Sequence, residues 1–246
     1  MLINIQFKQL NAFLKRRHEV DIFAAMEMNA VIFDMDGLLI DSEPLWKEAA
    51  DELFLNFGIE LSLEQYAKTT GLRTREFLDF WFNRFNIPAT EIDQAEKIIV
   101  NRVIDLVMLK GKPMPGVQHI FNFFTERGFK IGLATSSSPD LIQVVTDLLG
   151  IRSVLNAVSS AKDLSYGKPH PEVYMDCARK LNTLPAHCIC FEDSYNGMIA
   201  AKAAGMKCVI VPSKPESQKL HWEAADLKIS TLSNFNELLL RSLIVI

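Results

Sequence analysis

Short, continuous apolar runs separated by longer helical patterns make up most of the chain. The runs cover residues 30–33, 130–134, 154–158, 188–191 and 208–211. Polar or turn residues bound each run, and the segments between them space their apolar residues as helices do. Fully apolar strands that alternate with helices are typical of a parallel sheet covered on both faces. The pattern therefore predicts an α/β fold built on a doubly wound parallel sheet.

One long helical stretch, residues 43–111, separates the first two of these runs. Its helical patterns, broken at glycine or proline, cover 44–57, 63–68, 75–85 and 91–109. We therefore expect an α/β core of residues 28–42 and 112–246, with a helical cap of residues 43–111 inserted after the first strand. Residues 1–27 are expected to be an N-terminal extension, either a weak amphipathic helix or an overlong gene start, and we assign them no chemistry.

Composition narrows the range of partners. The 246 residues are 49% apolar and 23% charged, which is typical of a globular protein. The formal charge of −4 offers no basic surface for nucleic acid or an anionic membrane. No apolar run reaches the ~18 residues of a membrane span, and residues 1–27 lack a signal-peptide layout. The four cysteines form no CxxC pair. We expect a cytoplasmic monomer with no nucleic-acid or membrane partner.

Two acidic residues directly follow the first apolar run. Parallel sheets bind ligands beyond the carboxyl ends of their strands, so this position draws attention. Asp34 and Asp36 are two residues apart and can face the same pocket in an extended chain. Adjacent carboxylates stay ionised when a divalent cation lies between them, and hard oxygen ligands suit Mg²⁺. A surface aspartate pair at a turn is the alternative.

Hydroxyl side chains follow the second apolar run, at the start of a helix over 140–149. Thr135, Ser136 and Ser137 could cradle a phosphate there, although an ordinary helix cap explains them equally well. Lys168 lies next to Pro169, in a segment stiffened by proline. A stiffly held lysine can balance the charge of a carboxylate and a phosphate together. A surface loop lysine is the alternative.

A second acidic pair, Glu192 and Asp193, ends the run over 188–191. Each of these features is weak by itself. Together they place two acidic clusters, a hydroxyl loop and a rigid lysine at one edge of the predicted sheet. This combination predicts a site for a metal ion and a phosphoryl group.

The same residues resemble the signature motifs of the haloacid dehalogenase superfamily over about 28–212. The matching positions are Asp34-x-Asp36-Gly37, Thr135, Lys168 and Glu192-Asp193. Longer stretches resemble the hexitol phosphatase and 2-deoxyglucose-6-phosphate phosphatase subgroup of the β-phosphoglucomutase-like family. These stretches are 33–46, Gly71-Leu72-Arg73, 168–178 and 192–200. The resemblance implies a Rossmann-like core with a helical cap and a Mg²⁺-dependent phosphatase acting on sugar or sugar-alcohol phosphates.

The resemblance also implies roles for the core residues. Asp34 would be the nucleophile that forms an aspartyl-phosphate, and Asp36 the general acid and then base. Mg²⁺ would bind the Asp34 carboxylate, the Asp36 main-chain carbonyl and Asp193, with Glu192 beside it. The loop of Thr135, Ser136 and Ser137 would hold the phosphoryl oxygens, and Lys168 would bridge nucleophile and phosphate. These roles fit the charge neutralisation that phosphoryl transfer requires.

Substrate choice is expected to lie in the cap, with Ser42, Trp46 and Arg73 as candidates. Trp46 adjoins an apolar stripe and could instead belong to the cap core. The main alternative activity is that of a β-phosphoglucomutase. The resemblance implies that mutases of this type have a histidine where this chain has Trp46, and that their cap arginine lies one position beyond Arg73. Both departures favour the phosphatase. A non-catalytic phosphometabolite-binding protein is expected to lack Asp34 or Asp36, and both are present.

Overall fold

The computed structural model describes residues 28–244. Its centre is a six-stranded sheet in the order β3-β2-β1-β4-β5-β6, and each pair of neighbours is parallel. The strands are β1 Ala30–Phe33, β2 Lys130–Thr135, β3 Ala157–Ser160, β4 Cys188–Glu192, β5 Lys207–Ile210 and β6 Leu227–Lys228. The predicted α/β class with a doubly wound parallel sheet is confirmed. The expected N-terminal extension, residues 1–27, lies outside the described residues.

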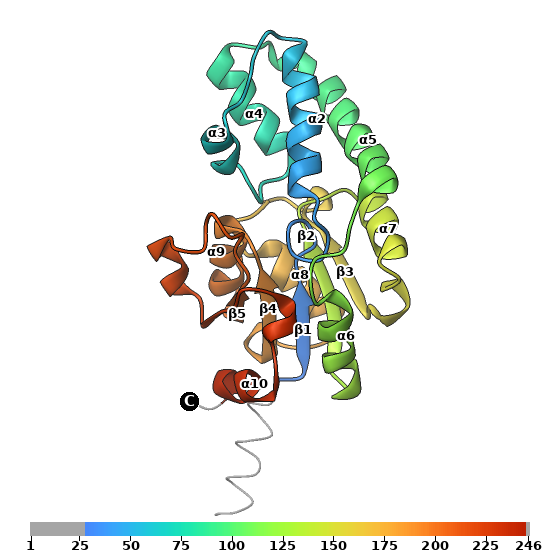
Figure 1. Cartoon of the computed structure of the whole chain (residues 1–246), viewed down its shortest axis with the longest axis vertical. Helices are drawn as coiled ribbons and strands as arrows, with labels where there is room; N and C mark the ends of the chain where they lie inside the picture. Colours follow the sequence, from blue (N-terminus) through green and yellow to red (C-terminus); the bar gives the residue numbers. More distant parts are fainter. Residues whose placement is uncertain (1–27, 245–246) are drawn as a thin grey trace, which may run out of the picture.

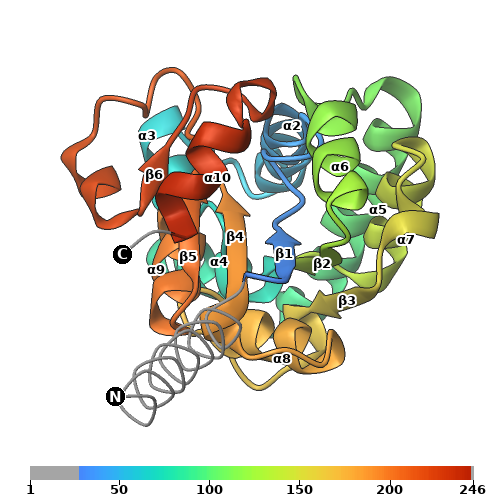
Figure 2. The ribbon, with the colours of Figure 1, turned by 90° about the horizontal axis from the view of Figure 1, so that it is seen from below.

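Helices cover both faces of the sheet (Figure 2). They are α6 Val117–Glu126, α7 Pro139–Leu148, α8 Glu172–Lys180, α9 Tyr195–Ala203 and α10 Glu237–Ile244. Side chains of β1 alternate between two apolar clusters: Val31 and Phe33 pack with α6, α7 and α10, whereas Ala30 and Ile32 pack with α8 and α9. Burial on both faces explains why the strand is apolar at every position.

The cap residues 43–111 form a group of helices at the carboxyl end of the sheet (Figure 1). The helices are α2 Glu43–Leu55, α3 Leu63–Ala67, α4 Thr74–Phe85 and α5 Ile92–Lys110. Aromatic rings fill the space between them: Phe54 packs edge-to-face against Phe77 and Phe82, each with ring centroids 5.9 Å apart. The division of the chain into a core and a cap domain stays a prediction.

Two adjacent segments connect the core to the cap. The backbone N–H of Asp41 donates to the carbonyl of Lys112 at 2.9 Å, and the N–H of Met114 donates to that of Leu39 at 2.9 Å. Between them Ile40 and Pro113 form an antiparallel bridge. The chain therefore enters and leaves the cap side by side.

The third strand starts later than its apolar run predicts. The run covers 154–158, but Arg152–Val154 forms a 3-10 turn and β3 spans Ala157–Ser160. Asn156 explains the shift, because its backbone N–H donates to the Ile131 carbonyl and its side chain accepts from the Ile131 N–H, both at 2.7 Å. Val154 and Leu155 pack against the apolar cluster without joining the sheet.

The apolar core of residues 28–244 contains most of the large hydrophobic side chains, whereas some, such as Leu63 and Leu109, are exposed. All four cysteines are free and buried. Among residues 28–244, no helix combines the length and apolarity that crossing a membrane requires.

Candidate active site

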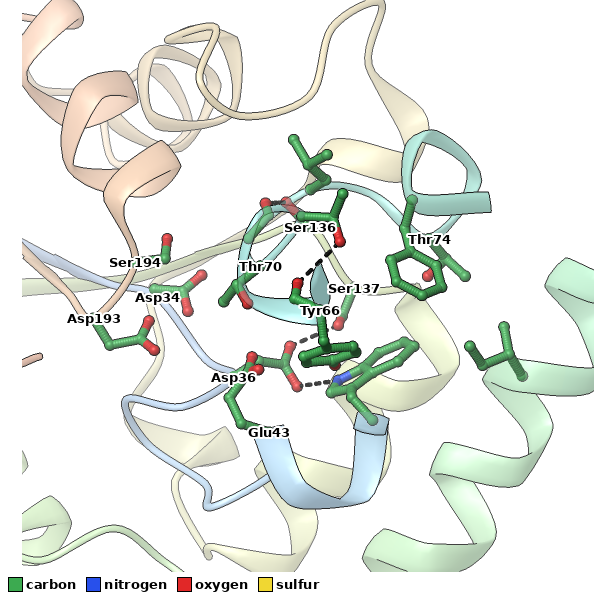
Figure 3. Close-up of a pocket in the computed structure, with 16 residues that line it drawn as sticks. Asp34, Asp36, Glu43, Tyr66, Thr70, Thr74, Ser136, Ser137, Asp193 and Ser194 are labelled. Atoms are coloured by element: carbon green, nitrogen blue, oxygen red, sulfur yellow. Dashed lines mark hydrogen bonds between the residues drawn. The ribbon is translucent and has the colours of Figure 1, made fainter. Parts of the chain in front are cut away.

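A cleft lies between the carboxyl edge of the sheet and the cap. Its core side is formed by residues that follow β1, β2 and β4, the positions to which the sequence pointed. Its cap side is formed by α2, α3, α4, the loop between the last two, and Ile99 of α5. The charged residues that line it are Asp34, Asp36, Glu43 and Asp193 (Figure 3).

Lys168 lies beneath the cleft and is 2% exposed. Its Nζ is 2.5 Å from Asp34 Oδ1 and 2.6 Å from Glu192 Oε1. Burial opposes the positive charge, but the carboxylates of Asp34 and Glu192 outweigh it and raise the pKa of Lys168 above its usual range. The ammonium group is therefore a fixed positive charge that neutralises two carboxylates at once, one just after β1 and one at the end of β4.

Glu192 uses both of its oxygens inside the protein. Oε1 accepts from Lys168 and from the Tyr174 hydroxyl, the latter at 2.7 Å. Oε2 accepts from the backbone N–H groups of Asp193 and Ser194 at 2.9 Å each, and from the Ser194 hydroxyl at 3.0 Å. Burial opposes ionisation, but Lys168 and these donors lower the pKa of Glu192 overall. Glu192 is thus ionised, and it orients its neighbours.

The close approach of Gly197 shows how tightly Glu192 is enclosed. A Cβ at Gly197 would lie 1.7 Å from Glu192 Oε1, a separation no side chain can adopt. The N-terminal turn of α9 therefore reaches the carboxylate only because residue 197 is glycine. The sequence places this glycine three residues after Ser194, which caps the same helix by accepting the Gly197 N–H.

Three carboxylates could together hold a metal ion. Asp34, Glu192 and Asp193 each offer an oxygen within 4.8 Å of the others. Asp193 Oδ1 is buried and has no hydrogen-bond partner within the described chain. Burial raises the pKa of Asp34 and of Asp193 well above the usual range, and the neighbouring carboxylates add to the effect. An orphaned oxygen among crowded acids fits a divalent cation, which would supply the missing charge.

The Asp36 carboxylate faces a different set of partners. Oδ1 accepts from the Ser42 hydroxyl at 2.7 Å and from the Trp46 indole N–H at 2.8 Å. Oδ2 accepts from the Ser137 hydroxyl at 2.6 Å (Figure 3). Ser42 directly precedes α2 and Trp46 lies in its first turn, so the start of the cap fixes the orientation of a core aspartate. Trp46 is half-buried and lines the cleft while its ring packs on the apolar cluster.

The hydroxyl loop after β2 divides its tasks among successive residues. Ser138 is the helix cap of α7 and accepts the Leu141 N–H. Thr135 is buried, and its Oγ1 accepts the Ser137 N–H at 3.1 Å. Ser136 and Ser137 line the cleft, and Ser136 Oγ donates to the Gly71 carbonyl of the cap at 2.8 Å. Ser138 is thus the helix-capping residue, and the phosphate-binding role of Thr135, Ser136 and Ser137 stays a prediction.

The cap candidates differ in position. Ser42 and Trp46 lie against Asp36, whereas Arg73 is absent from the lining of the cleft described above. Glu43 and Tyr66, which the sequence analysis did not consider, do line it. A signal for Glu43 was available, because it lies one helical turn before Trp46 on the same face of α2. Tyr66 carries no comparable signal, since α3 is a short helix with little pattern.

Glu43 is expected to make the stability of the metal-free protein depend on pH. Burial, with Asp36 and Asp41 nearby, raises the pKa of Glu43 from 4.5 to about 8. The protonated form of Glu43 makes its full contribution to the free energy of unfolding below pH 4.5, and this contribution is lost as the pH rises toward 8. Urea unfolding in EDTA should therefore show Glu43→Gln gaining roughly 1–3 kcal/mol over the wild type between pH 5 and pH 8.

The matched control is Glu48→Gln, a substitution at a more exposed position of the same helix. Its difference from the wild type should stay nearly constant over this range. A constant difference for Glu43→Gln as well would contradict the expected titration.

Comparisons with known proteins agree with this geometry. Residues 28–205 match the model of the haloacid dehalogenase-like hydrolases, and the chain belongs to this family. The chain is 40% identical to hexitol phosphatase B of Escherichia coli K12 over 207 residues, which cover 83% of this chain and 92% of that protein. The phosphorylated carbohydrates phosphatase of Thermotoga maritima is 28% identical, over 73% and 83% of the two chains.

The solved structure of a β-phosphoglucomutase from Clostridium difficile has the same fold. Its TM-score is 0.79 at 24% identity, covering 88% of this chain and 97% of that one. The family and the phosphatase relatives define this protein as a phosphoric monoester hydrolase of the haloacid dehalogenase-like type. The predicted family and enzyme class are confirmed.

Proposed function

We propose that the protein is a Mg²⁺-dependent phosphatase that hydrolyses sugar and sugar-alcohol monophosphates through an aspartyl-phosphate intermediate. The buried Lys168, held between Asp34 and Glu192, is the observation that carries this proposal. Lys168 places a permanent positive charge beside the Asp34 carboxylate at the end of β1. A carboxylate nucleophile needs such a charge nearby when it approaches an anionic phosphoryl group. Asp34 also lines the cleft, where a substrate can reach it.

In the first step an Asp34 oxygen forms a bond to phosphorus while the bond from phosphorus to the sugar oxygen breaks. Asp36 donates a proton to the leaving oxygen. In the second step Asp36 takes a proton from water, whose oxygen attacks phosphorus and releases Asp34 and inorganic phosphate. The hydrogen bonds from Ser42, Trp46 and Ser137 hold the Asp36 carboxylate in the cleft throughout.

The remaining core residues bind and orient the phosphoryl group. Thr135 and the loop of Ser136 and Ser137 would hold its oxygens, and Lys168 would bridge it to Asp34. Mg²⁺ would be held by the Asp34 and Asp193 carboxylates and the Asp36 carbonyl, with Glu192 behind them, and would neutralise charge on the transferring oxygens. The unpartnered Asp193 oxygen and the raised pKa values of Asp34 and Asp193 support this assignment.

The character of the cleft supports a neutral, hydroxyl-rich leaving group. Within residues 28–244, its lining includes four carboxylates and no lysine, arginine or histidine. A second phosphate or a carboxylate on the substrate would meet repulsion there. Glu43, Tyr66 and Thr70 instead offer groups that hydrogen-bond sugar hydroxyls. The relatives named for hexitols and phosphorylated carbohydrates are consistent with 2-deoxyglucose 6-phosphate and hexitol phosphates as substrates.

The deciding experiment measures inorganic phosphate released from a panel of phosphate esters, with Mg²⁺ and with EDTA. The panel contains 2-deoxyglucose 6-phosphate, sorbitol 6-phosphate, mannitol 1-phosphate, β-glucose 1-phosphate, fructose 1,6-bisphosphate and phosphoglycolate. We expect Mg²⁺-dependent release from the first three and slow release from the last two. Conversion of β-glucose 1-phosphate to glucose 6-phosphate with little free phosphate would identify a mutase instead. Cytoplasmic location and a monomeric state stay predictions.

Trp46→Phe is expected to lower kcat about 10-fold, because Asp36 loses one donor of the kind worth about 1–2 kcal/mol. The aromatic packing stays, and Ser42 and Ser137 still bind the carboxylate, so thermal stability should change little. Trp81→Phe is the matched control: its indole N–H donates to Thr69 Oγ1 at 3.1 Å inside the cap. Equal loss of kcat in both variants would show that the effect is unrelated to Asp36.

A further inference from the structure

Arg73 joins the cap to the core loop that leads to Lys168. Its Nη1 donates to the carbonyl of Leu164 at 3.0 Å and to that of Ala161 at 3.4 Å. Its Nη2 donates to Glu76 Oε1 at 2.6 Å, while Glu76 Oε2 accepts the Arg73 backbone N–H at 3.1 Å. The guanidinium therefore faces main-chain carbonyls of the core, and its side chain is 22% exposed.

Gly167 shows that this contact is close. A Cβ at Gly167 would lie 2.5 Å from Glu76 Oε2 and 2.8 Å from Arg73 Nε. Its φ lies outside the left-handed region, so a Cβ there would not strain the backbone, but the Arg73 and Glu76 side chains would have to move to admit it. Gly167 is buried and directly precedes Lys168. The Arg73–Glu76 ion pair therefore packs directly against Gly167, the residue before Lys168.

The same cap segment also contacts the other two loops of the site. Gly71 O accepts from Ser136 Oγ at 2.8 Å, and Thr70 O accepts from Asn196 Nδ2 at 2.9 Å. Residues 70–76 therefore touch the loop after β2, the first turn of α9 and the loop before α8. Each contact uses a polar partner, so it can form and break without exposing an apolar core.

We propose that Arg73 and Glu76 are a positioning pair that holds the loop of residues 161–168, and through it the ammonium group of Lys168, when the cap lies on the core. The kinetic consequence rests on the phosphatase proposed above. Docking of the cap completes the charge arrangement around Asp34. Chemistry is thereby coupled to closure over the substrate. Arg73 acts through Lys168 and has no need to touch the sugar.

Steady-state kinetics separate this role from direct substrate binding. Arg73→Ala and Gly167→Ala should each lower kcat roughly 10- to 100-fold, as a displaced catalytic group does. The loss should be similar for a sugar phosphate and for p-nitrophenyl phosphate, with little change in KM. The double variant should lose less than the product of the two single losses, because both disturb one contact. A raised KM for the sugar phosphate alone, with kcat unchanged, would overturn the proposal in favour of direct binding.

The matched control is Arg75→Ala, because Arg75 is exposed and pairs with Asp93 of the cap. It should leave kcat and KM unchanged. Thermal unfolding of all variants shows whether any substitution has caused a general loss of structure.

Backbone hydrogen exchange tests the proposal without any turnover. Arg73→Ala should speed exchange in the peptide that covers 161–168, and Arg75→Ala should not. Unchanged exchange there in Arg73→Ala would overturn the proposed pair. If the wild type released no phosphate from any ester, the phosphatase proposal would fail, and the exchange experiment would still decide whether Arg73 holds this loop.

Discussion

Asp34→Asn will abolish phosphate release, with kcat falling roughly 10⁴- to 10⁶-fold, as it does when a catalytic nucleophile is removed. The amide has the size of the carboxylate, but it lacks the negative oxygen that attacks phosphorus in the proposed mechanism. Lys168 keeps its contact with Glu192, so the fold should persist. Burial already disfavours the charged form of Asp34, as its raised pKa shows. The variant should therefore melt no lower than the wild type in EDTA.

The readouts are phosphate release from 2-deoxyglucose 6-phosphate and thermal unfolding. Asp147→Asn is the control, because Asp147 is an exposed aspartate paired with Arg152, outside the cleft. Phosphate release at the wild-type rate by Asp34→Asn would exclude the aspartyl-phosphate route. A sharp fall in melting temperature would instead show that the substitution damages the fold.

Lys168→Met will combine the loss of activity with the largest loss of stability that we expect from a single substitution. It leaves Asp34 and Glu192 buried without their shared counter-charge. Removing one partner of a buried ion pair costs about 3–5 kcal/mol. Urea unfolding in EDTA should show this loss, and Mg²⁺ should restore part of it, because the cation supplies positive charge to the same carboxylates.

Lys180→Met provides the comparison on the surface. Lys180 is 42% exposed and lies 2.8 Å from Asp176, so its loss should cost about 1 kcal/mol or less. If Lys168→Met were as stable as Lys180→Met in EDTA, the buried carboxyl groups of Asp34 and Glu192 would not need Lys168 in the folded protein. The assignment of Lys168 as their counter-charge would then be wrong.

The central strands and the residues that follow them could be predicted because each depends on local sequence. β1, β2 and β4 are apolar at nearly every position, and a parallel sheet brings their carboxyl ends to one edge. β6 was missed because a strand of only two residues, Leu227–Lys228, has no periodicity to detect. α10 was missed as well, although its apolar residues follow a helical spacing.

The cap side of the cleft was harder to predict, because it depends on how separate helices pack. Arg73 has the chemistry of a phosphate ligand, yet the core offers it two carbonyls and the cap offers it Glu76. Tyr66 reaches the cleft only because α3 lies over Asp36 and Glu43, whose negative charges add to burial in raising the pKa of Tyr66. No spacing along the chain encodes such contacts, which arise from tertiary packing.

The paired segments at the base of the cap have a consequence for how such enzymes diversify. Because Ile40 and Pro113 lie side by side, the whole of residues 43–111 replaces what would otherwise be a short connection. Loops with adjacent ends tolerate long insertions at little entropic cost. A gene encoding this core can therefore accept a different cap without any change in the strands, provided that the new cap supplies its own contacts to Asp36 and to the loop before Lys168. New substrate ranges can then evolve in the insert while the ancestral strands stay under separate selection.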